Sequence, residues 1–355
     1  PLGAAPVSAG GVNLGGVTQL AANASMSCAV LQDATARCWG SGPLGTGGAF
    51  NQSSPLAVQV QDANGDPLTG VTQMAVGTGF ACALLQDTSA VCWGDNLVGN
   101  LGNGTTTPSA RPVVVQQQGG ATLTGITQLA LGDFHACARL SSGEARCWGQ
   151  NQGTLGDGTR TNRKRAVAVQ NAAGTGPLTN VVQLATGSQH TCVILDTGAT
   201  VCWGNGSDGR LGYGDTQDLG DNEDLMSSAL DVGGAAVLRI SAGRAHTCAL
   251  LDGGDVRCWG QGAAGKLGQG ATDNLGDAPG DLPALIPSVV VDDDPTAQVL
   301  DIVAGGDHTC ARLDGGRVRC WGEAAAGQLG YGTVDDIGND PGELPSSAGD
   351  VPVGG

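Results

Sequence analysis

The sequence predicts an all-β fold: a β-propeller whose blades are four-stranded antiparallel sheets, with six repeats. Two observations lead to this prediction. Glycine accounts for 62 of the 355 residues and aromatic residues for only 3%, so turn-forming residues interrupt the chain every few positions, as in folds made of short strands. Each of the six Trp residues stands in a Cys-Trp-Gly triplet, and another Cys lies ten positions before the Cys of that triplet.

These cysteine pairs mark the repeats. Their first members are 54, 55, 55, 56 and 62 residues apart, and a period of this size with about four strand-like runs is typical of a propeller blade. We place the repeats at approximately residues 5–48, 55–104, 111–158, 166–214, 229–270 and 286–332, with an extra strand at 350–355. Together they form a single predicted propeller domain over residues 1–355.

The third repeat illustrates the expected strands, which cover Pro112–Val115, Ile126–Leu131, His135–Leu140 and Glu144–Trp148. The turn before the last strand changes from repeat to repeat, whereas the ten-residue cysteine spacing does not. Because side chains alternate along a strand, this spacing places both cysteines on one face of the hairpin. If the turn sets them opposite each other, their Cβ atoms come within bridging distance.

We therefore predict one disulfide within each hairpin. The six predicted bonds are Cys28–Cys38, Cys82–Cys92, Cys137–Cys147, Cys192–Cys202, Cys248–Cys258 and Cys310–Cys320. Reduced cysteines acting as small apolar side chains are the alternative, and a zinc site is disfavoured because no Cys-x-x-Cys occurs in the sequence. So many disulfides indicate an oxidising compartment, and we expect a secreted, extracellular or cell-surface protein.

Glycine-rich loops follow the Trp residues and spell, at Gly260, Gly262 and Gly265, the G-x-G-x-x-G pattern of dinucleotide-binding sites. In those sites the pattern opens a helix of a βαβ unit. Here a Thr- and Asp-rich loop follows, and variants of the pattern recur in every repeat. We expect these glycines to permit positive φ angles and close backbone contacts, and we expect no nucleotide cofactor.

Residues 304–332, AGGDHTCARLDGGRVRCWGEAAAGQLGYG, resemble the repeat of the regulator-of-chromosome-condensation family. The matching motifs are Gly-Gly-x-His-Thr, the Asp-Gly turn, the strand that ends in Trp-Gly, and Gly-Gln-Leu-Gly-x-Gly. The resemblance recurs six times in register and implies a propeller of four-stranded blades, although seven repeats are usual in that family. It suggests a bacterial-type, disulfide-linked member. The family includes a nuclear exchange factor for a small GTPase and a secreted β-lactamase inhibitor, so the fold does not select a partner.

The two ends of the chain bear on how the propeller closes. Ala5–Gly11 and Asp350–Gly355 both resemble the first strand of a repeat. Soluble proteins avoid unpaired sheet edges. We therefore expect a closed ring of six blades in which these two segments pair within one blade. The alternative is a seven-bladed ring completed by a neighbouring chain or a missing repeat.

The net charge of −17 is unevenly distributed. Residues 1–180 carry 8 acidic and 8 basic side chains, and residues 181–355 carry 25 acidic and 8 basic ones. Such a field repels nucleic acid and anionic membranes, and no apolar run in the sequence is long enough to span a membrane. We expect Asp292–Asp294 and the basic cluster Arg160–Arg165 to be solvated loops.

Repeats four to six contain a longer acidic loop. Oxygen-bearing side chains around a glycine turn suit Ca²⁺, although no EF-hand pattern is present, and solvated turns are the alternative. The candidate ligands are Asp218, Asp221, Asp224, Asp277, Asp281, Asp336, Asn339 and Glu343. The four His residues stand two positions before the first Cys of a pair, at His135, His190, His246 and His308. We expect them to be structural and to bond the backbone rather than a metal.

These observations predict a secreted, non-catalytic scaffold that binds another macromolecule, in our interpretation a protein, through its rim loops. The Trp residues belong to the repeats, so the aromatic residues left for partner contacts are Tyr213, Tyr331, Phe50, Phe80 and Phe134. One alternative is an extracellular polysaccharide lyase or hydrolase with an Asp-lined site at the channel mouth. The other is a structural unit of a self-associating array, a longer surface protein or a fibre.

Overall fold

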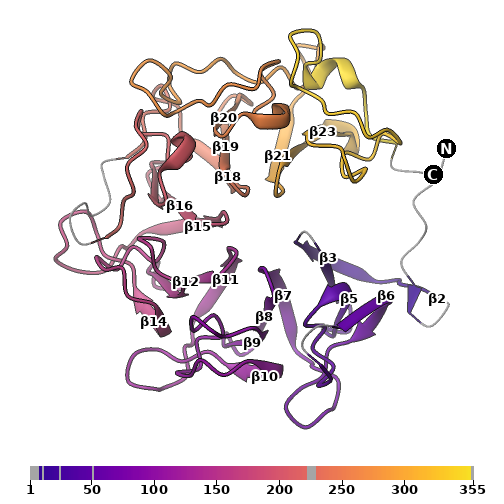
Figure 1. The fold of residues 1–355 in the computed structure, drawn as a ribbon, viewed down its shortest axis with the longest axis vertical. Helices are drawn as coiled ribbons and strands as arrows, with labels where there is room; N and C mark the ends of the chain where they lie inside the picture. The colour runs from indigo at the N-terminus through magenta and orange to yellow at the C-terminus, as the bar shows by residue number, and fades with distance from the viewer. Residues whose placement is uncertain (1–7, 10–11, 24, 50–51, 222–228, 353–355) are drawn as a thin grey trace. The chain divides into compact units, whose positions relative to one another are not determined.

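The structure is a computed structural model that describes residues 8–9, 12–23, 25–49, 52–221 and 229–352. The chain divides into two compact units. The first unit contains the described residues up to Leu184 together with Gly220 and Asp221, and the second contains Ala185–Leu219 and residues 229–352. Each unit is built from small antiparallel sheets whose strands are in chain order (Figure 1). The assignment of the whole chain to a single domain stays a prediction.

Three four-stranded sheets form most of the first unit. The first sheet consists of β3 (Val17–Ala22), β4 (Met26–Leu31), β5 (Ala36–Gly42) and β6 (Gln52–Gln59). The second consists of β7 (Val71–Val76), β8 (Phe80–Leu85), β9 (Ala90–Gly94) and β10 (Ser109–Val114). The third consists of β11 (Ile126–Leu131), β12 (His135–Leu140), β13 (Ala145–Gly149) and β14 (Arg163–Ala168).

Three three-stranded sheets follow. They consist of β15 (Val181–Thr186), β16 (His190–Leu195) and β17 (Thr200–Gly204); β18 (Val237–Ala242), β19 (His246–Leu251) and β20 (Val256–Gly260); and β21 (Val299–Ala304), β22 (His308–Leu313) and β23 (Val318–Gly322). The remaining elements are β1 (Ser8–Ala9), β2 (Val12–Asn13) and the short 3-10 helices η1 (Ser207–Gly209), η2 (Ala263–Gly265), η3 (Asp314–Gly316) and η4 (Pro345–Ala348). The described ranges contain no α-helix, and the predicted all-β class is confirmed.

The outermost strand of each four-stranded sheet follows its hairpin in the sequence instead of preceding it. We expected residues 112–115 to open the third repeat, but β10 pairs with β9 of the second sheet, where Val113 is opposite Cys92. The sequence of a strand does not indicate whether it pairs with the hairpin before it or after it. The loop after each Trp is long enough for the chain to return to the hairpin that it has just left.

In repeats four to six the described residues form only two separate contacts in place of this outermost strand. In the fifth repeat Leu275 forms an isolated bridge with Gly260, and Val289 N–H donates to Val256 O at 2.8 Å. The corresponding contacts join Leu219 to Gly204 and Leu230 to Thr200 in the fourth repeat, and Ile337 to Gly322 and Val351 to Val318 in the sixth. These sheets therefore have three strands instead of the expected four, because the acidic loop lies between the two contacts.

The pairing of the two terminal segments with each other stays a prediction. Ser8 and Ala9 pair with Asn13 and Val12 in a two-stranded arrangement. Val351 N–H donates to Val318 O at 2.8 Å and so adds to the edge of the last sheet. Of the predicted extra strand, residues 353–355 lie outside the described part of the chain.

All six predicted disulfides are present. The two cysteines of each pair are direct partners in the register of neighbouring strands, as Cys82 on β8 and Cys92 on β9 illustrate. Their Cα atoms lie 4.0–4.1 Å apart in all six pairs. The expected hairpin geometry is confirmed.

The Trp residues connect consecutive repeats. Trp93, Trp148, Trp259 and Trp321 are fully buried, and the indole N–H of each donates to a main-chain carbonyl in the preceding repeat. The acceptor is the residue before Leu-Gly in the loop that follows the preceding Trp. For Trp93 it is Pro43 O at 2.8 Å. A buried indole N–H needs such a partner, so the Leu-Gly loop and the next Trp form one structural unit.

Candidate functional site

The glycine pattern of the fifth repeat is explained by contacts between chain segments. A Cβ atom on Gly260 would lie 2.5 Å from Ala245 O, and one on Gly262 would lie 1.9 Å from Asp273 O. A Cβ on Gly265 would lie 2.2 Å from the carbonyl carbon of Gly338 in the next repeat. Any side chain would therefore collide with backbone at these positions. The expected close backbone contacts are confirmed.

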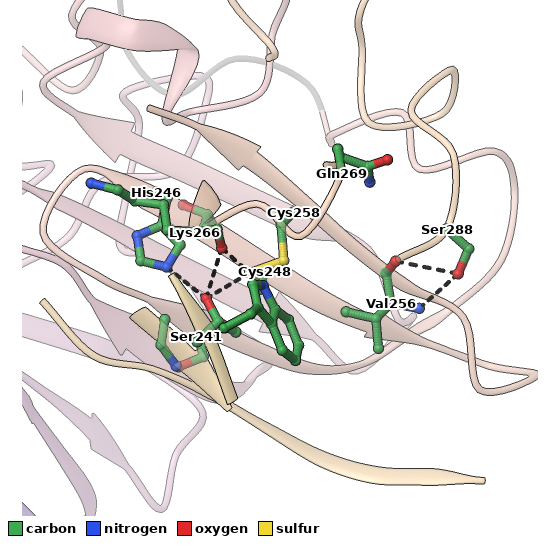
Figure 2. Close-up of a disulfide and its surroundings, with 12 residues drawn as sticks. Ser241, His246, Cys248, Val256, Cys258, Lys266, Gln269 and Ser288 are labelled. Atoms are coloured by element: carbon green, nitrogen blue, oxygen red, sulfur yellow. Dashed lines mark hydrogen bonds between the residues drawn. A yellow bond between two sulfur atoms is a disulfide. The ribbon is translucent and has the colours of Figure 1, made fainter. Parts of the chain in front are cut away.

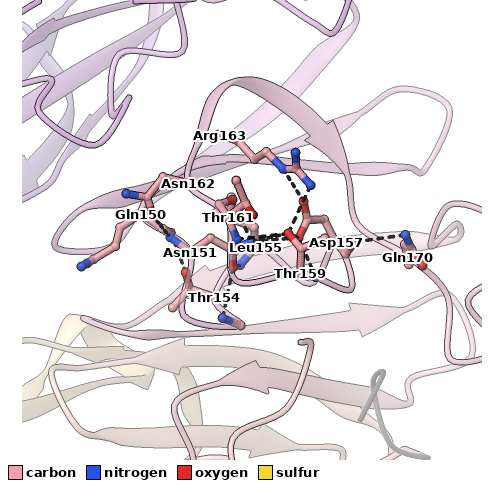
Figure 3. Close-up of polar contacts among 11 residues, drawn as sticks. Gln150, Asn151, Thr154, Leu155, Asp157, Thr159, Thr161, Asn162, Arg163 and Gln170 are labelled. Carbon is pink, nitrogen blue, oxygen red and sulfur yellow. Dashed lines mark hydrogen bonds and ion pairs between the residues drawn. The ribbon is translucent and has the colours of Figure 1, made fainter. Parts of the chain in front are cut away.

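In the third repeat a side chain fills the loop that resembles a phosphate cradle (Figure 3). Asn151 is 2% exposed, and its Oδ1 accepts the N–H groups of Gly153 and Leu155 at 3.1 and 3.4 Å. Its Nδ2 donates to Asp157 Oδ1 at 2.8 Å and to Thr161 O at 3.2 Å. The N–H groups that an anion would need are thus bonded within the loop.

The acidic loops of repeats four to six bond the first part of the corresponding loop. The position of Asn151, three residues after Trp, is Gly206, Gly262 or Ala324 in these repeats. The main-chain N–H of each donates to a side-chain oxygen twelve residues later, much as Asn151 N–H donates to Asn162 Oδ1 at 2.9 Å in the third repeat. These bonds are Gly206 to Asp218 at 3.0 Å, Gly262 to Asn274 at 3.1 Å and Ala324 to Asp336 at 2.8 Å. Two of the proposed calcium ligands therefore close a backbone loop.

The other candidate calcium ligands have varied surroundings. Asp221 is bonded to Arg160, whose Nε lies 2.8 Å from Asp221 Oδ2. Burial, followed by a hydrogen bond with Asp281, raises the pKa of Asp277. Asp281 also accepts Ala278 N–H at 2.9 Å.

Glu343 is exposed, and Asn339 Oδ1 is buried without a hydrogen-bond partner within the described ranges. Asp224 lies outside the described residues. Among the residues that the structure describes, no three His, Cys, Asp or Glu side chains come together as metal ligands. Calcium binding by these loops stays a prediction.

Two of the buried histidines bond threonine hydroxyls in the next repeat, and not the backbone as we expected. His246 Nε2 lies 2.9 Å from Thr309 Oγ1, and the Thr309 hydroxyl donates to Lys266 O at 3.1 Å. Because that hydroxyl proton is already used, the imidazole carries its proton on Nε2. His190 and Thr247 repeat the contact at 2.9 Å. Burial lowers the pKa of His246 to about 3. Figure 2 shows His246 with Lys266 and the Cys248–Cys258 disulfide.

The second unit contains a buried ion pair that the sequence does not predict. Lys266 is 2% exposed, and its Nζ donates to Asp307 Oδ1 at 2.6 Å and to Gln261 Oε1 at 2.9 Å. Arg244 Nη1 lies 3.0 Å from Asp307 Oδ2. Burial would raise the pKa of Asp307, but the hydrogen bond and charge of Lys266 and the charge of Arg244 hold it below its usual value. This cluster joins neighbouring repeats and leaves no unpaired charge to act on a ligand.

The basic cluster of residues 160–165 is not the solvated loop that we expected. Arg163 Nε lies 2.6 Å from Asp157 Oδ2, and Arg165 Nε donates to Gln116 Oε1 at 3.0 Å. Residues 163–165 belong to β14. Lys164 is exposed. Most of the cluster's charge therefore stabilises the third sheet and its loops.

The aromatic residues offered as partner contacts are mostly part of the fold. Tyr213 Oη accepts Cys202 N–H at 3.2 Å, and Tyr331 Oη accepts Cys320 N–H at 3.0 Å. Phe80 is fully buried. Phe134 is half-buried, and Phe50 lies outside the described residues. A contact surface for a partner is therefore expected to be aliphatic rather than aromatic.

Aliphatic side chains are exposed at β-bulges of the second unit. The pairing of β18 with β19 shifts register between Val237 and Arg239, and that of β21 with β22 shifts between Val299 and Asp301. The extra residues of these bulges are Leu238 and Leu300, whose exposed fractions are 47% and 42%. In the first three repeats the residue at this position is Thr18, Thr72 or Thr127, whose hydroxyl donates to a carbonyl of the paired strand.

Leu238 and Leu300 line a common groove of about 940 Å³ between the fifth and sixth sheets. The third exposed aliphatic side chain of the groove is Val290, at 44%. Almost fully buried lining side chains are Leu250, Leu251, Val289, Val291 and Leu313. A hollow that exposes aliphatic side chains to water next to polar ones is typical of a binding surface. This groove is the candidate functional site.

Charged residues also line the groove. Asp255 and Asp294 are exposed. Hydrogen bonds from the main chain and hydroxyl of Thr296 lower the pKa of Asp294, which is therefore ionised at neutral pH. Asp292 forms ion pairs with Arg317 at 2.5 Å and with Arg319 at 3.0 Å.

Arg239 is the cation on this surface, and its Nε lies 3.9 Å from Asp301 Oδ1. Asp255 and Asp294 form no direct ion pair within the described residues, although the charge of Arg317 helps to lower the pKa of Asp294. No helix in the described part of the chain is both long and apolar enough to cross a membrane.

Comparisons with known proteins identify the repeats. Models of the regulator of chromosome condensation (RCC1) repeat match residues 126–153, 181–210, 237–266 and 299–328, and a second model of the same repeat matches residues 253–312. The chain is 30% identical over 319 residues to the ultraviolet-B receptor UVR8 of Arabidopsis thaliana. This alignment covers 88% of this chain and 66% of the receptor. It is 29% identical to the human E3 ubiquitin-protein ligase HERC2, over 74% of this chain and 5% of the ligase. The chain thus spans only part of these relatives.

Solved structures show the same fold. Human WBSCR16 aligns with a TM-score of 0.72 and 21% identity, over 90% of this chain and 80% of that protein. Yeast RCC1 (Prp20), solved bound to Kap60, aligns with a TM-score of 0.69 and 19% identity, over 94% of this chain and 74% of that protein. The predicted fold, a β-propeller of antiparallel sheets, is confirmed. This chain belongs to the family of proteins built from the regulator of chromosome condensation (RCC1) repeat.

Proposed function

We propose that this chain is a secreted, non-catalytic scaffold that binds another protein. The groove between the fifth and sixth sheets carries the proposal, because Leu238, Val290 and Leu300 expose 42–47% of their surface in it. Their burial by a partner would remove apolar area from water. Each adjoining hairpin is closed by a disulfide, so little conformational entropy would be lost on binding.

Protein binding by relatives supports the proposal. Yeast RCC1 was solved bound to Kap60, and the structure of Prp20p from Saccharomyces cerevisiae is described with its binding to Gsp1p and histones. Both likenesses are near 20% identity. They therefore support protein binding as a function of the fold and do not identify the partner of this chain.

Secretion is proposed from the cysteines. All twelve are joined in disulfides, and none is free. Disulfides in this number persist in oxidising environments and are rare in the reducing cytosol.

A hydrolase is the second candidate, and one carboxyl pair favours it. Burial and the hydrogen bond with Asp281 raise the pKa of Asp277. A carboxyl group with a raised pKa can act as a general acid. A hydrolase of this chain would therefore be expected to lose its activity in an Asp277→Asn variant.

The experiment is affinity capture from the extracellular fraction of the source organism. The immobilised, disulfide-intact chain is expected to retain a protein that a reduced and alkylated chain does not retain. Retention of a second copy of the same chain alone would indicate an array. Retention of nothing by the folded chain contradicts the scaffold. Polysaccharide cleavage that Asp277→Asn abolishes would establish the hydrolase instead.

A further inference from the structure

The bulge residues of repeats one to three differ from those of repeats five and six. In repeats one to three the bulge holds threonine, whose hydroxyl is satisfied by a carbonyl of its own sheet at 3.1–3.2 Å. In repeats five and six the bulge holds Leu238 and Leu300, which are 47% and 42% exposed to solvent. Threonine shows that the bulge itself does not require leucine. Because β-bulges re-aim side chains and are common at binding sites, the two leucines need an explanation outside the sheet.

We propose that the groove between Leu238 and Leu300 binds an extended segment of a partner protein that carries aliphatic side chains next to lysine or arginine. The proposal rests on the proposed function of the chain as a protein-binding scaffold. It assigns the place of binding and the chemistry of the bound segment.

The size of the groove fits a segment rather than a domain surface. Its volume of about 940 Å³ is that of a site for a small ligand or a few amino-acid residues. Val290, which lies between the two leucines' sheets, adds a third apolar contact along the groove. Three separate aliphatic contacts fit alternate side chains of an extended peptide.

The charge of the groove selects a basic segment. Asp255 and Asp294 are exposed along it, and neither forms an ion pair with another described residue. Asp292 is already neutralised by Arg317 and Arg319. The surrounding half of the chain, residues 181–355, carries 25 acidic and 8 basic side chains. Such a field attracts cationic peptides and repels acidic ones.

Three short fluorescein-labelled peptides test the proposal by fluorescence anisotropy with the full chain. The first alternates leucine with lysine, the second leucine with glutamate, and the third serine with lysine. The Leu/Lys peptide is expected to bind at least about tenfold more tightly than either of the others. Equal binding of the Leu/Glu peptide would overturn the charge selection. Equal binding of the Ser/Lys peptide would reduce the interaction to non-specific electrostatics, and absence of Leu/Lys binding would overturn the proposal as a whole.

Variants locate the binding in the groove. Leu238→Thr with Leu300→Thr introduces the residue found at this position in repeats one to three. The sheet is therefore expected to fold. This double variant should weaken Leu/Lys binding by about tenfold or more, and Asp255→Asn should weaken it less and make it less sensitive to salt. The matched control is Leu285→Thr, because Leu285 is 61% exposed and does not line the groove. Equal loss in this control would overturn the assignment to the groove.

The failure of this inference can be distinguished from failure of the scaffold function. A partner captured equally by the wild-type chain and by the Leu238→Thr, Leu300→Thr variant would overturn the groove and leave the scaffold function intact. A captured partner that the double variant loses, and that the Leu/Lys peptide displaces from the wild-type chain, would support the groove. Capture of no protein by either form contradicts the scaffold function itself.

Discussion

Gln73 and Leu129 are joined by two hydrogen bonds that link consecutive repeats. Gln73 Nε2 donates to Leu129 O, and Leu129 N–H donates to Gln73 Oε1, both at 2.9 Å. The side-chain amide thus pairs with both main-chain groups of one residue, as a neighbouring strand would. The same double contact joins Gln19 to Met74 and Gln128 to Leu184. In the fifth and sixth repeats the corresponding residues are Arg239 and Asp301.

The glutamine bridge is expected to stabilise the first unit measurably. Gln73→Glu keeps the shape of the side chain but replaces the N–H donor by a carboxylate oxygen that faces Leu129 O. We expect a loss of about 2 kcal/mol in the free energy of unfolding at neutral pH, measured by urea denaturation. Gln152→Glu is the control, because Gln152 is exposed. An equal effect of the two substitutions would mean that the bridge contributes nothing beyond the added charge.

The disulfides are expected to be complete in the native protein. Alkylation of the denatured, non-reduced chain should add no alkyl groups, and reduction before alkylation should add one to each of the twelve cysteines, as measured by intact mass. Uptake before reduction would contradict both the pairing and the proposed secretion.

A single disulfide is expected to have a clear effect on stability. Cys82→Ala with Cys92→Ala opens a loop of sequence separation 10, and the chain-entropy model gives a loss of about 2–3 kcal/mol in the free energy of unfolding. Urea denaturation of this variant and of the wild-type chain measures the difference. A change below about 0.5 kcal/mol would show that hairpin pairing alone holds the two strands together.

Stability is expected to fall on mild acidification. Burial lowers the pKa of His246 to about 3 and that of His135 to about 4, from the ordinary value of 6.5. Below about pH 6.5 these histidines become protonated in the unfolded chain but stay neutral in the folded chain. The free energy of unfolding therefore falls by about 1.4 kcal/mol per pH unit for each histidine. The lowered pKa values of Asp292 and Asp307 act in the same direction only near and below pH 3.8.

Urea denaturation between about pH 7 and pH 5 isolates the histidine contribution. His246→Leu is expected to be less stable than the wild-type chain at neutral pH, because the bond to Thr309 is lost. Its stability should nevertheless depend less on pH by about 1.4 kcal/mol per pH unit. An unchanged pH dependence would show that His246 titrates normally in the folded chain.

The acidic loops are expected to depend on a hydrogen bond more than on calcium. Asp336 Oδ1 accepts Ala324 N–H at 2.8 Å, and asparagine offers the same acceptor without the charge. Asp336→Asn should therefore retain the melting temperature, whereas Asp336→Ala should lose about 1–2 kcal/mol of stability. A chelator should lower the melting temperature weakly, if at all. A large fall with chelator, together with destabilisation by Asp336→Asn, would instead indicate a calcium site.

Features that depend on short spacings follow directly from the amino-acid sequence. The ten-residue interval between Cys82 and Cys92 spans one hairpin, so the two strands, their register and the disulfide follow from residues that are close in the chain. The six-fold recurrence of that interval fixed the repeat and the all-β class. Local geometry of this kind leaves few alternatives, because side chains alternate strictly along a strand.

Contacts between distant segments could be found only in the folded chain. The same strand-like run could pair with the hairpin before it or after it, and only the folded chain shows that β10 joins β9. Asp218 and Asp336, which the sequence suggests as cation ligands, each accept a backbone N–H twelve residues earlier, and the sequence does not indicate that contact. The groove is formed by Leu238 and Leu300, which lie 62 positions apart in different repeats. Their exposure is a result of packing between sheets, for which the sequence of either strand carries no local signal.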